Sequence, residues 1–231
     1  MNHSKLTRVL VNGIPLSQYI DSCDIILSSD ATDKTVMEST AKEYMPGLQD
    51  SSVSASGFYD GASGAVDDLL SATFGTGSDL WTWFPEGDAF GLTGRGMLAE
   101  RSAYSVNSTV DGASRISIAG QGSTQSHFIT SLHSRAVRTA SGSGAALDNG
   151  AASAAGAVGY LQALAVTGSV VVKIEHSTNG TTWADLISFT PVNGRGGQRI
   201  SVPGTVNRYV RATFTLDGGE SIEMQVAFKR L

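Results

Sequence analysis

The stretch "SVVVKIEHS", residues 169–177, alternates apolar and polar side chains. Val170, Val172 and Ile174 recur at every second position, and Lys173 falls between the last two. Successive side chains of a β-strand point to opposite faces, so a period of two is typical of a strand with one buried face. This stretch therefore predicts a half-buried strand.

Two further stretches repeat the alternation, namely "RYVRATFTL" (208–216) and "SIEMQVAFKRL" (221–231). The side chains predicted to face inward are Val210, Ala212, Phe214, Leu216, Ile222, Met224, Val226 and Phe228. Turns of the Asn-Gly, Pro-Gly and Asp-Gly-Gly types separate these strands. Strands at regular spacing with such turns predict an antiparallel β-sandwich.

The first half of the chain also predicts short strands. In "TRVLVNGIPLSQYI" (7–20), Asn12-Gly13 between two apolar runs predicts a tight hairpin, because both residues tolerate positive φ. "CDIILSS" (23–29) and "DKTVMESTAKEYM" (33–45) are further strand candidates. "SDLWTWFPEGDAFG" (78–91) predicts a strand with both of its tryptophans on one face, which ends at the proline.

One amphipathic helix is predicted at about 63–75. Val66, Leu69, Leu70 and Phe74 have the spacing that places side chains on one helical face. Ser63 is the expected N-terminal cap, and two aspartates in the first turn suit the positive end of the helix dipole.

The stretch "TASGSGAALDNGAASAAGAVG" (139–159) consists almost entirely of small residues. Such composition is typical of a linker or of loops at a domain edge. We therefore predict a boundary near residue 142, with one β domain over 1–142 that contains the helix and a second over 143–231.

The composition excludes several classes of protein. A chain of 231 residues with 16 Lys+Arg and a net charge of −5 lacks the clustered cations of a phosphate-gripping surface. Its one cysteine, Cys23, cannot form an internal disulfide and is expected to be a small buried side chain. No apolar run is long enough to span a bilayer, and we expect a chain made in the cytoplasm.

Catalytic, metal and cofactor sites are not predicted. The histidines show no zinc-ligand spacing with cysteine. His127 and His133 would share one face of an extended strand, but ordinary surface or partly buried histidines are the better interpretation. "SGSGA" (141–145) lacks the first glycine of a nucleophile elbow, and "GLTGRG" (91–96) lacks the dinucleotide spacing. We therefore predict that the protein is not an enzyme.

A separate motif is "EHSTNGTTWADLISF", 175–189. Its Ser-x-Asn-Gly-x-Thr-Trp core looks like the Asp-box hairpin of sialidase-type propellers, with Asn in place of Asp and one residue fewer. A propeller would need several copies, and one is present. The favoured interpretation is that Trp183 anchors a hairpin. The alternative is a sugar-stacking role for Trp183 or Trp81.

The first 135 residues or so resemble the major tail tube proteins of long-tailed (siphovirus-like) bacteriophages. The similarity begins at "VLVNGIPLSQYIDSCDI" (9–25) and passes through "MPGLQDSSVSASGFYDG" (45–61). It continues through the helix at "AVDDLLSATFG" (65–75) and the strand at "WTWFPEGDAFG" (81–91). The rest of the chain looks like the extra β-sandwich domain that many such proteins carry on the outside.

The resemblance implies a mainly β fold, with a tail-tube-like sandwich or barrel and one helix, followed by an antiparallel β-sandwich. It implies hexameric rings that stack into a tube, the conduit for DNA ejection into the host. Residues 47–60 would belong to the shared barrel wall, and residues 28–44 would form the loop that stacks rings. The residues expected at ring or stacking interfaces are Lys34, Met37, Glu38, Tyr44, Met45 and Leu48.

The implied partners are further copies of the chain, a tape measure protein and a tail terminator protein, without membrane insertion. DNA would pass through the bore without specific binding, and the net negative charge is consistent with that passage. No cofactor is implied. The alternative function is a glycan- or cell-surface-binding β-sandwich module that uses Trp183.

Overall fold

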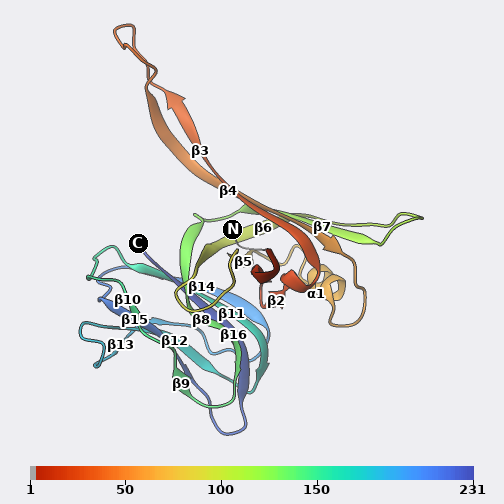
Figure 1. Cartoon of the computed structure of the whole chain (residues 1–231), viewed down its shortest axis with the longest axis vertical. Coiled ribbons are helices and arrows are strands. Elements are labelled where there is room, and N and C mark those ends of the chain that lie inside the picture. The colour runs from red at the N-terminus through yellow and green to blue at the C-terminus, as the bar shows by residue number, and fades with distance from the viewer. Residues whose placement is uncertain (1–3) are drawn as a thin grey trace.

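A computed structural model describes residues 4–231, which form mainly β-strands (Figure 1). The strands are β1 (Arg8–Val11), β2 (Ile14–Pro15), β3 (Ile20–Asp33), β4 (Tyr44–Phe58), β5 (Asp79–Phe84), β6 (Thr93–Asn107), β7 (Arg115–Gly122), β8 (His127–Arg138), β9 (Gly142–Ser143), β10 (Leu147–Asp148), β11 (Ala157–Thr167), β12 (Val171–Ser177), β13 (Ala184–Ser188), β14 (Gly196–Val202), β15 (Tyr209–Thr215) and β16 (Ser221–Arg230). The helices are the 3-10 turns η1 (Ser4–Leu6) and η2 (Leu16–Gln18) and the α-helix α1 (Val66–Ala72). The predicted mainly β class with one α-helix is confirmed for the described residues.

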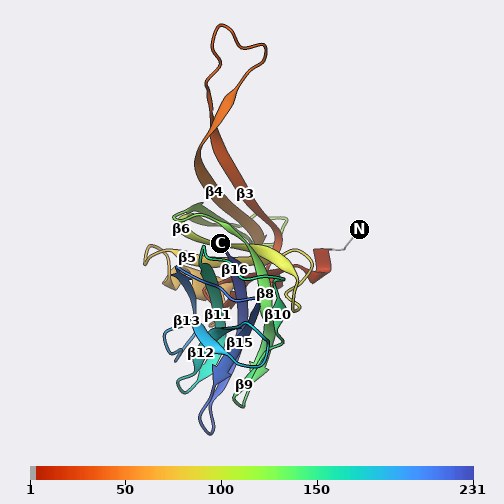
Figure 2. The ribbon, with the colours of Figure 1, turned by 90° about the vertical axis from the view of Figure 1, so that its left-hand side faces the viewer.

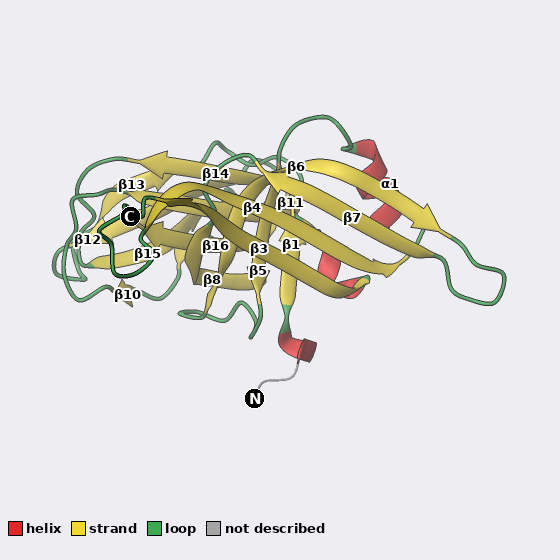
Figure 3. Ribbon diagram, turned by 90° about the horizontal axis from the view of Figure 1, so that it is seen from above, coloured by secondary structure: helices red, strands yellow, loops and turns green. Residues whose placement is uncertain are grey.

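The strands form two antiparallel sheets (Figures 1 and 3). The larger sheet runs in the order β14-β11-β16-β8-β6-β5-β1-β2, and a branch β7-β4-β3 leaves it at β6. The smaller sheet runs β10-β15-β12-β13, with β9 also paired to β15. Three buried clusters fill the space between and beside these layers.

The first predicted hairpin is present and is held by the second half of the chain. Asn12 and Gly13 join β1 to β2 with φ values of 47° and 76°, as the Asn-Gly signal predicted. A Cβ on Gly13 would overlap the carbonyl oxygen of Ala163, so only glycine fits against β11. Gly13 also donates its N–H to Oε1 of buried Gln162 at 2.7 Å.

The faces predicted for the C-terminal strands are confirmed, since all eight inward side chains are buried, as are Val170, Val172 and Ile174. The larger sheet nevertheless runs across residue 142. β16 lies between β8 of the first half and β11 of the second, and it pairs with both. The division into 1–142 and 143–231 remains a prediction, and any such domains share one sheet.

The helix is shorter than predicted, and Ser63 does not cap it. The residue at the cap is Ala65, which makes no side-chain bond to the helix. The N–H of Asp67 in the first turn is accepted by the carbonyl of Asp60 at 3.1 Å, and Oδ2 of Asp68 accepts the N–H of Gly64, which precedes the helix, at 2.8 Å. Phe74 lies beyond the last helical residue and is exposed, because the chain leaves the helix at Thr73.

The other strand candidates have mixed outcomes. Trp81 and Trp83 pack in the same cluster on β5, as predicted. The stretch 33–45 is not one strand. Asp33 ends β3, Tyr44 begins β4, and residues 34–43 form the loop between them, where a polar, lysine- and glutamate-rich sequence has no sheet face to bury.

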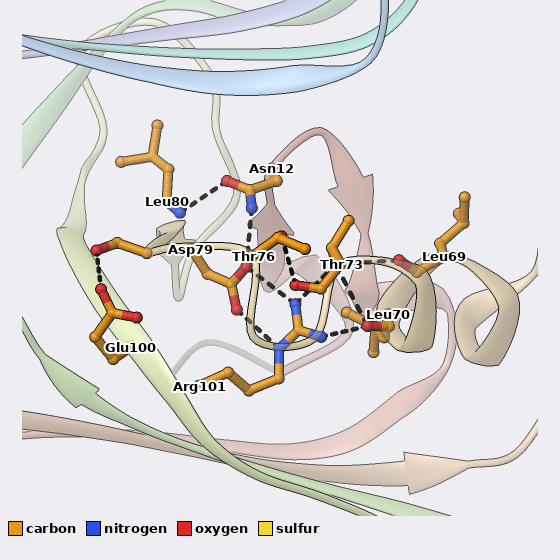
Figure 4. A network of polar contacts seen from close by, with 10 residues as sticks. Asn12, Leu69, Leu70, Thr73, Thr76, Asp79, Leu80, Glu100 and Arg101 are labelled. Atoms are coloured by element: carbon orange, nitrogen blue, oxygen red, sulfur yellow. Dashed lines mark hydrogen bonds and ion pairs between the residues drawn. The ribbon is translucent and has the colours of Figure 1, made fainter.

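A buried ion pair ties α1 to the large sheet (Figure 4). Arg101 donates from Nε and Nη2 to the two carboxylate oxygens of Asp79 at 2.8 and 2.9 Å. The same guanidinium bonds the carbonyl of Leu70 and, at 3.1 Å, the hydroxyl of Thr73 at the end of the helix. Burial raises the pKa of Asp79, and the guanidinium opposes that rise.

The same network reaches the first hairpin. Asn12 donates from Nδ2 to Asp79 at 2.9 Å and accepts the N–H of Leu80 at 2.8 Å (Figure 4). Because every bond in this group is buried or partly buried, it holds the helix end, β5, β6 and the β1–β2 turn in one arrangement.

Candidate assembly interface

The β3–β4 hairpin extends far beyond the sheet as an arm (Figures 1 and 2). Near its base β4 pairs with β7 through residues 52–58. From residue 51 outward β4 pairs only with β3, and β3 pairs with no other described strand along its whole length. The outer arm is therefore a two-stranded ribbon with a tip loop at residues 34–43.

Apolar side chains cover this ribbon although it has no core. The exposed ones are Ile26, Leu27, Val36, Met37, Tyr44, Met45 and Leu48. A lone two-stranded hairpin is only marginally stable in water, and an exposed strand edge invites pairing with another chain. Exposed apolar groups on such an element mark an interaction surface.

Polar contacts fix the base of the arm and its tip. At the base, Gln121 donates to Asp50 at 2.6 Å and Gln125 donates to Gln49 at 2.8 Å. At the tip, Lys34 donates its backbone N–H to the carbonyl of Glu43 at 2.9 Å, and their side chains form an exposed ion pair at 3.4 Å. The arm is thus ordered at both ends and unsupported between them.

The outer arm also bends. The pairing of β3 with β4 shifts register between Ser29 and Ala31. Opposite this irregularity, a Cβ on Gly47 would come within 2.8 Å of Cβ of Asp30, so glycine permits the close approach of the two strands. Pro46 pairs with Ala31 and supplies no backbone donor.

The structure brings the six predicted interface residues together on this outer arm. Lys34, Met37 and Glu38 lie in the tip loop. Tyr44, Met45 and Leu48 lie in the part of β4 that follows this loop. All six are exposed, with the Met37 side chain fully so at 107% and Leu48 at 83%. Their role in contacts between copies remains a prediction.

Ile26, Leu27 and Val36 are exposed as well, although they are not among the interface residues predicted from the sequence. Ile26 and Leu27 are neighbours on a strand, so they point to opposite faces. Two adjacent apolar residues indicate a strand in which neither face alone is buried against a core. Both residues are exposed on β3.

The solvent-facing side of the strand group β3-β4-β7-β6 is covered with small polar residues. One row across the four strands consists of Ser22, Ser56, Ser117 and Ser105. The next row consists of Asp24, Ser54, Ala119 and Ala103. Arg115, at the margin of this face, is paired with Asp21 at 2.6 Å and holds the pKa of that carboxyl below its usual value.

The opposite side of the same strands faces a core. Its rows include Cys23, Ala55, Ile118 and Tyr104, which belong to or pack against one buried cluster. Cys23 is only partly buried, although burial and neighbouring Asp24 raise the pKa of its thiol to about 12. The four strands are therefore two-sided, with one polar face and one apolar face.

The large sheet and its branch end at three strands, β14, β2 and β3. At β14, the side chain of Gln198 accepts the N–H of Thr190 and donates to its carbonyl, both at 2.9 Å. These two bonds tie the chain that follows β13 to β14. The outer edge of β3 has no paired strand among the described residues.

The two histidines do not come together. His127 bonds the hydroxyl of Tyr160 through Nδ1 at 2.6 Å, whereas His133 packs edge-to-face on Phe214 in a different cluster. Register shifts around His133 in the pairing of β8 with β16 turn the two rings apart. Both are buried, more than the sequence indicated.

Burial and the nearby charges of Arg199 and Lys229 lower the pKa of His127 to about 4. Among the described residues no group of acidic, histidine or cysteine side chains could hold a metal ion. No described helix is both long and apolar enough to cross a bilayer.

The Asp-box-like motif forms a polar turn between β12 and β13. Ser177 Oγ accepts the N–H of Gly180 at 2.9 Å, and Asn179 Oδ1 accepts the N–H of Thr182 at 2.9 Å. Trp183 is half-buried, and the guanidinium carbon of Arg211 lies 4.1 Å from its ring centroid. A glycan contact at Trp183 remains a prediction.

Comparisons with known proteins give likenesses of structure and none of sequence. No family model matches the chain, and no curated protein matches it. A chain of the virion of a native gene transfer agent particle is 15% identical with a TM-score of 0.45, over 55% of this chain and 98% of that one. A chain of the tail of an empty particle of this agent, with C6 symmetry, is 16% identical with a TM-score of 0.46, over the same shares.

A third likeness spans nearly the whole molecule. The Dit (gp 19.1) protein of phage SPP1, described as a paradigm of the hub adsorption apparatus in phages that infect Gram-positive bacteria, is 12% identical with a TM-score of 0.41. The similarity covers 98% of this chain and 100% of that one.

Proposed function

We propose that this chain is a structural protein of a phage tail, whose copies form hexameric rings that stack into the tube for DNA ejection. The observation that carries the proposal is the β3–β4 arm, a hairpin with exposed apolar side chains and, within residues 4–231, no partner strand beyond its base. In a monomer the exposed apolar side chains and the unpaired strand edge favour aggregation. In a closed assembly the arm and the edge gain partners.

Lateral contacts within a ring use the strand group β3-β4-β7-β6. One margin of the group is the open edge of β3. At the other margin, the pairing of β6 with β5 ends at Ala99, and β7 is the only described strand that pairs with residues 101–107. Placing β3 of one copy beside this part of β6 in the next copy continues the sheet around the ring.

Contacts between rings use the outer arm. Its tip carries Met37 and its outer strand carries Tyr44, Met45 and Leu48, all exposed. Burying such side chains against the next ring is favourable by about 1.5–3 kcal/mol for each one that is fully covered. The β3–β4 arm that carries them extends away from the two sheets (Figures 1 and 2).

The serine- and alanine-rich face suits the wall of a DNA conduit. Its rows present hydroxyl and methyl groups and the carboxylate of Asp24, and the guanidinium of Arg115 is held by Asp21. DNA binds proteins chiefly through unpaired cations, so a wall without them lets the duplex slide. Tape measure and terminator proteins are the further partners that this proposal includes.

Negative-stain electron microscopy of the purified chain over a concentration series tests the proposal. The wild type is expected to form six-fold rings or hollow tubes. Two variants are expected to remain folded but not to stack. One lacks residues 30–44, and the other is the double variant Met37→Asp/Leu48→Asp. Val137→Asp, which alters an exposed apolar residue outside the arm, is the matched control. Dispersed wild-type monomers at every concentration, or tubes from the arm variants, would contradict the proposal.

A further inference from the structure

Four Asn-Gly pairs occur in the chain. They are Asn12-Gly13, Asn149-Gly150, Asn179-Gly180 and Asn193-Gly194. Asparagine before glycine is the sequence most prone to imide formation, because glycine has no side chain to hinder attack by its own backbone nitrogen. That attack needs a free glycine N–H and an asparagine side chain able to turn toward it.

At three of the four pairs the glycine N–H is already engaged by a side-chain acceptor. Gly13 donates to Gln162 Oε1 at 2.7 Å. Gly150 donates to Asp148 Oδ1 at 2.8 Å, and Gly180 donates to Ser177 Oγ at 2.9 Å. The nitrogen that would attack must first give up this bond.

The asparagine side chains of these pairs are engaged as well. Asn12 bonds Asp79 and the N–H of Leu80. Asn149 donates to the carbonyl of Arg208 at 3.1 Å, and Asn179 accepts the N–H groups of the two threonines that follow Gly180. Each side chain is therefore held away from the geometry of attack.

The fourth pair has none of these restraints. Asn193 is exposed, and neither its side chain nor the N–H of Gly194 makes a hydrogen bond to the described part of the chain. Space around Gly194 is open, since a Cβ placed there would meet no atom within 4 Å. We propose that Asn193 is a site of spontaneous deamidation, at which the folded protein acquires an aspartate or isoaspartate.

The reaction balances without a cofactor. The backbone nitrogen of Gly194 loses its proton to solvent base and bonds to Cγ of Asn193, whose side-chain nitrogen takes up a proton and leaves as ammonia. Water then opens the cyclic imide at either of its two carbonyl carbons. One opening leaves an aspartate, and the other leaves an isoaspartate with the backbone rerouted through the side chain.

The fold confines the change to one loop. Val192 and Val170 exchange two backbone hydrogen bonds of 2.8 Å on the N-terminal side of the site. On the other side Gly196 is paired with Ala163, and Arg195 donates from Nε to the carbonyl of Leu164 at 3.0 Å. The longer backbone of an isoaspartate must be absorbed within residues 193–195, which also gain one negative charge.

The test is incubation of the full-length protein at warm, mildly alkaline pH, followed by digestion and tandem mass spectrometry of all four pairs. The expected result is loss of the amide at residue 193 while the other three asparagines persist. The same incubation in denaturant is expected to convert all four, because the protective bonds are absent there. Equal conversion of all four in the folded protein, or none at residue 193, overturns the proposal.

A variant tests whether the hydrogen bond to the glycine N–H protects the asparagine before it. Asp148→Ala removes an exposed carboxylate and frees the N–H of Gly150, so Asn149, which keeps its bond to the carbonyl of Arg208, is expected to deamidate faster in this folded variant than in the folded wild type. Asn193→Gln is expected to abolish the reaction at residue 193, because the larger imide ring forms slowly. If Asn149 stays inert in Asp148→Ala while Asn193 also stays inert in the wild type, exposure and free N–H groups do not determine the modification.

Discussion

The N–H of Gly13 donates to the side-chain oxygen of Gln162, across 149 positions of sequence and in a buried environment. Gln162 also donates to the carbonyl of Leu80 at 2.9 Å. One amide side chain of β11 thus bonds a backbone N–H of the β1–β2 turn and a backbone carbonyl of β5, both in the first half of the chain. The two halves are held together by specific polar contacts as well as by the shared sheet.

Replacing Gln162 with leucine is expected to destabilise the whole protein. The N–H of Gly13 would remain buried without a partner, at a cost of about 1–3 kcal/mol, and the carbonyl of Leu80 would keep only the N–H of Asn12. Chemical denaturation should show one transition at lower denaturant. Gln198→Leu, which alters a more exposed amide, is the control. Two separate transitions, or an unchanged midpoint, would argue against the coupling of the halves.

Replacing Arg101 with methionine is expected to lower the free energy of unfolding by more than Gln162→Leu does. The carboxylate of Asp79 would then be buried without its cation, and breaking a buried pair in this way costs about 3–5 kcal/mol. The double variant Arg101→Met/Asp79→Asn should recover part of the loss, because it removes the uncompensated charge. Denaturation of the three proteins side by side measures this, and a stable single variant would contradict the assignment.

Acidification is expected to weaken the fold through His127. Its pKa is lowered to about 4 by burial, so between that value and the unfolded value of about 6.5 the unfolded chain binds the proton better. Stability should therefore fall as pH falls through this window, by up to about 3 kcal/mol. Denaturation at several pH values should show a shallower dependence in His127→Gln. A parallel dependence in both proteins would rule His127 out.

Adding cations to the serine-rich face is expected to hinder passage of DNA. In Ser54→Lys/Ser117→Lys the fold and the tubes should persist, since both positions are exposed. Fluorescent DNA should then be retained by the tubes and released by salt. Val110→Lys, at the exposed tip of the β6–β7 hairpin, is the control for added charge. Retention by the control alone would place the bore elsewhere.

A substitution at Trp183 distinguishes a structural role of this side chain from a role in glycan binding. Trp183→Ala removes the ring beneath the Arg211 guanidinium, and a stacked pair of this kind contributes about 0.5–2 kcal/mol. A glycan array with the full-length chain and this variant measures binding, and denaturation measures stability. Loss of stability without any glycan signal supports the hairpin anchor, whereas a glycan signal that the variant loses supports the alternative function.

Local patterns predicted the parts of the fold that local physics determines. Alternation at Val170, Val172 and Ile174 identified a buried face, and Asn12-Gly13 identified a turn, because each rule acts within a few residues. Ser63 was wrong as a cap because the N–H of Asp67 in the first turn bonds the backbone carbonyl of Asp60 instead. That acceptor depends on the path of the preceding loop, which the spacing of side chains does not contain.

The remaining differences arise from long-range pairing. The separation of His127 from His133 follows from irregular pairing with β16, nearly a hundred positions further along the chain. The length of the free arm follows from where β7 stops pairing with β4. Neither event leaves a mark near the residues concerned. The predicted interface residues on the arm came from the family resemblance, and their exposure is what the structure adds.

The place of β16 sets an order on folding. This strand, residues 221–230, lies between β8 and β11, and both of these strands precede it in the chain. During synthesis the ribosome releases all the other strands first, so β8 and β11 wait with exposed edges until β16 arrives. The sheet closes only after translation of these residues. Until then a nascent chain lacks the pairing that joins β8 to β11 through β16.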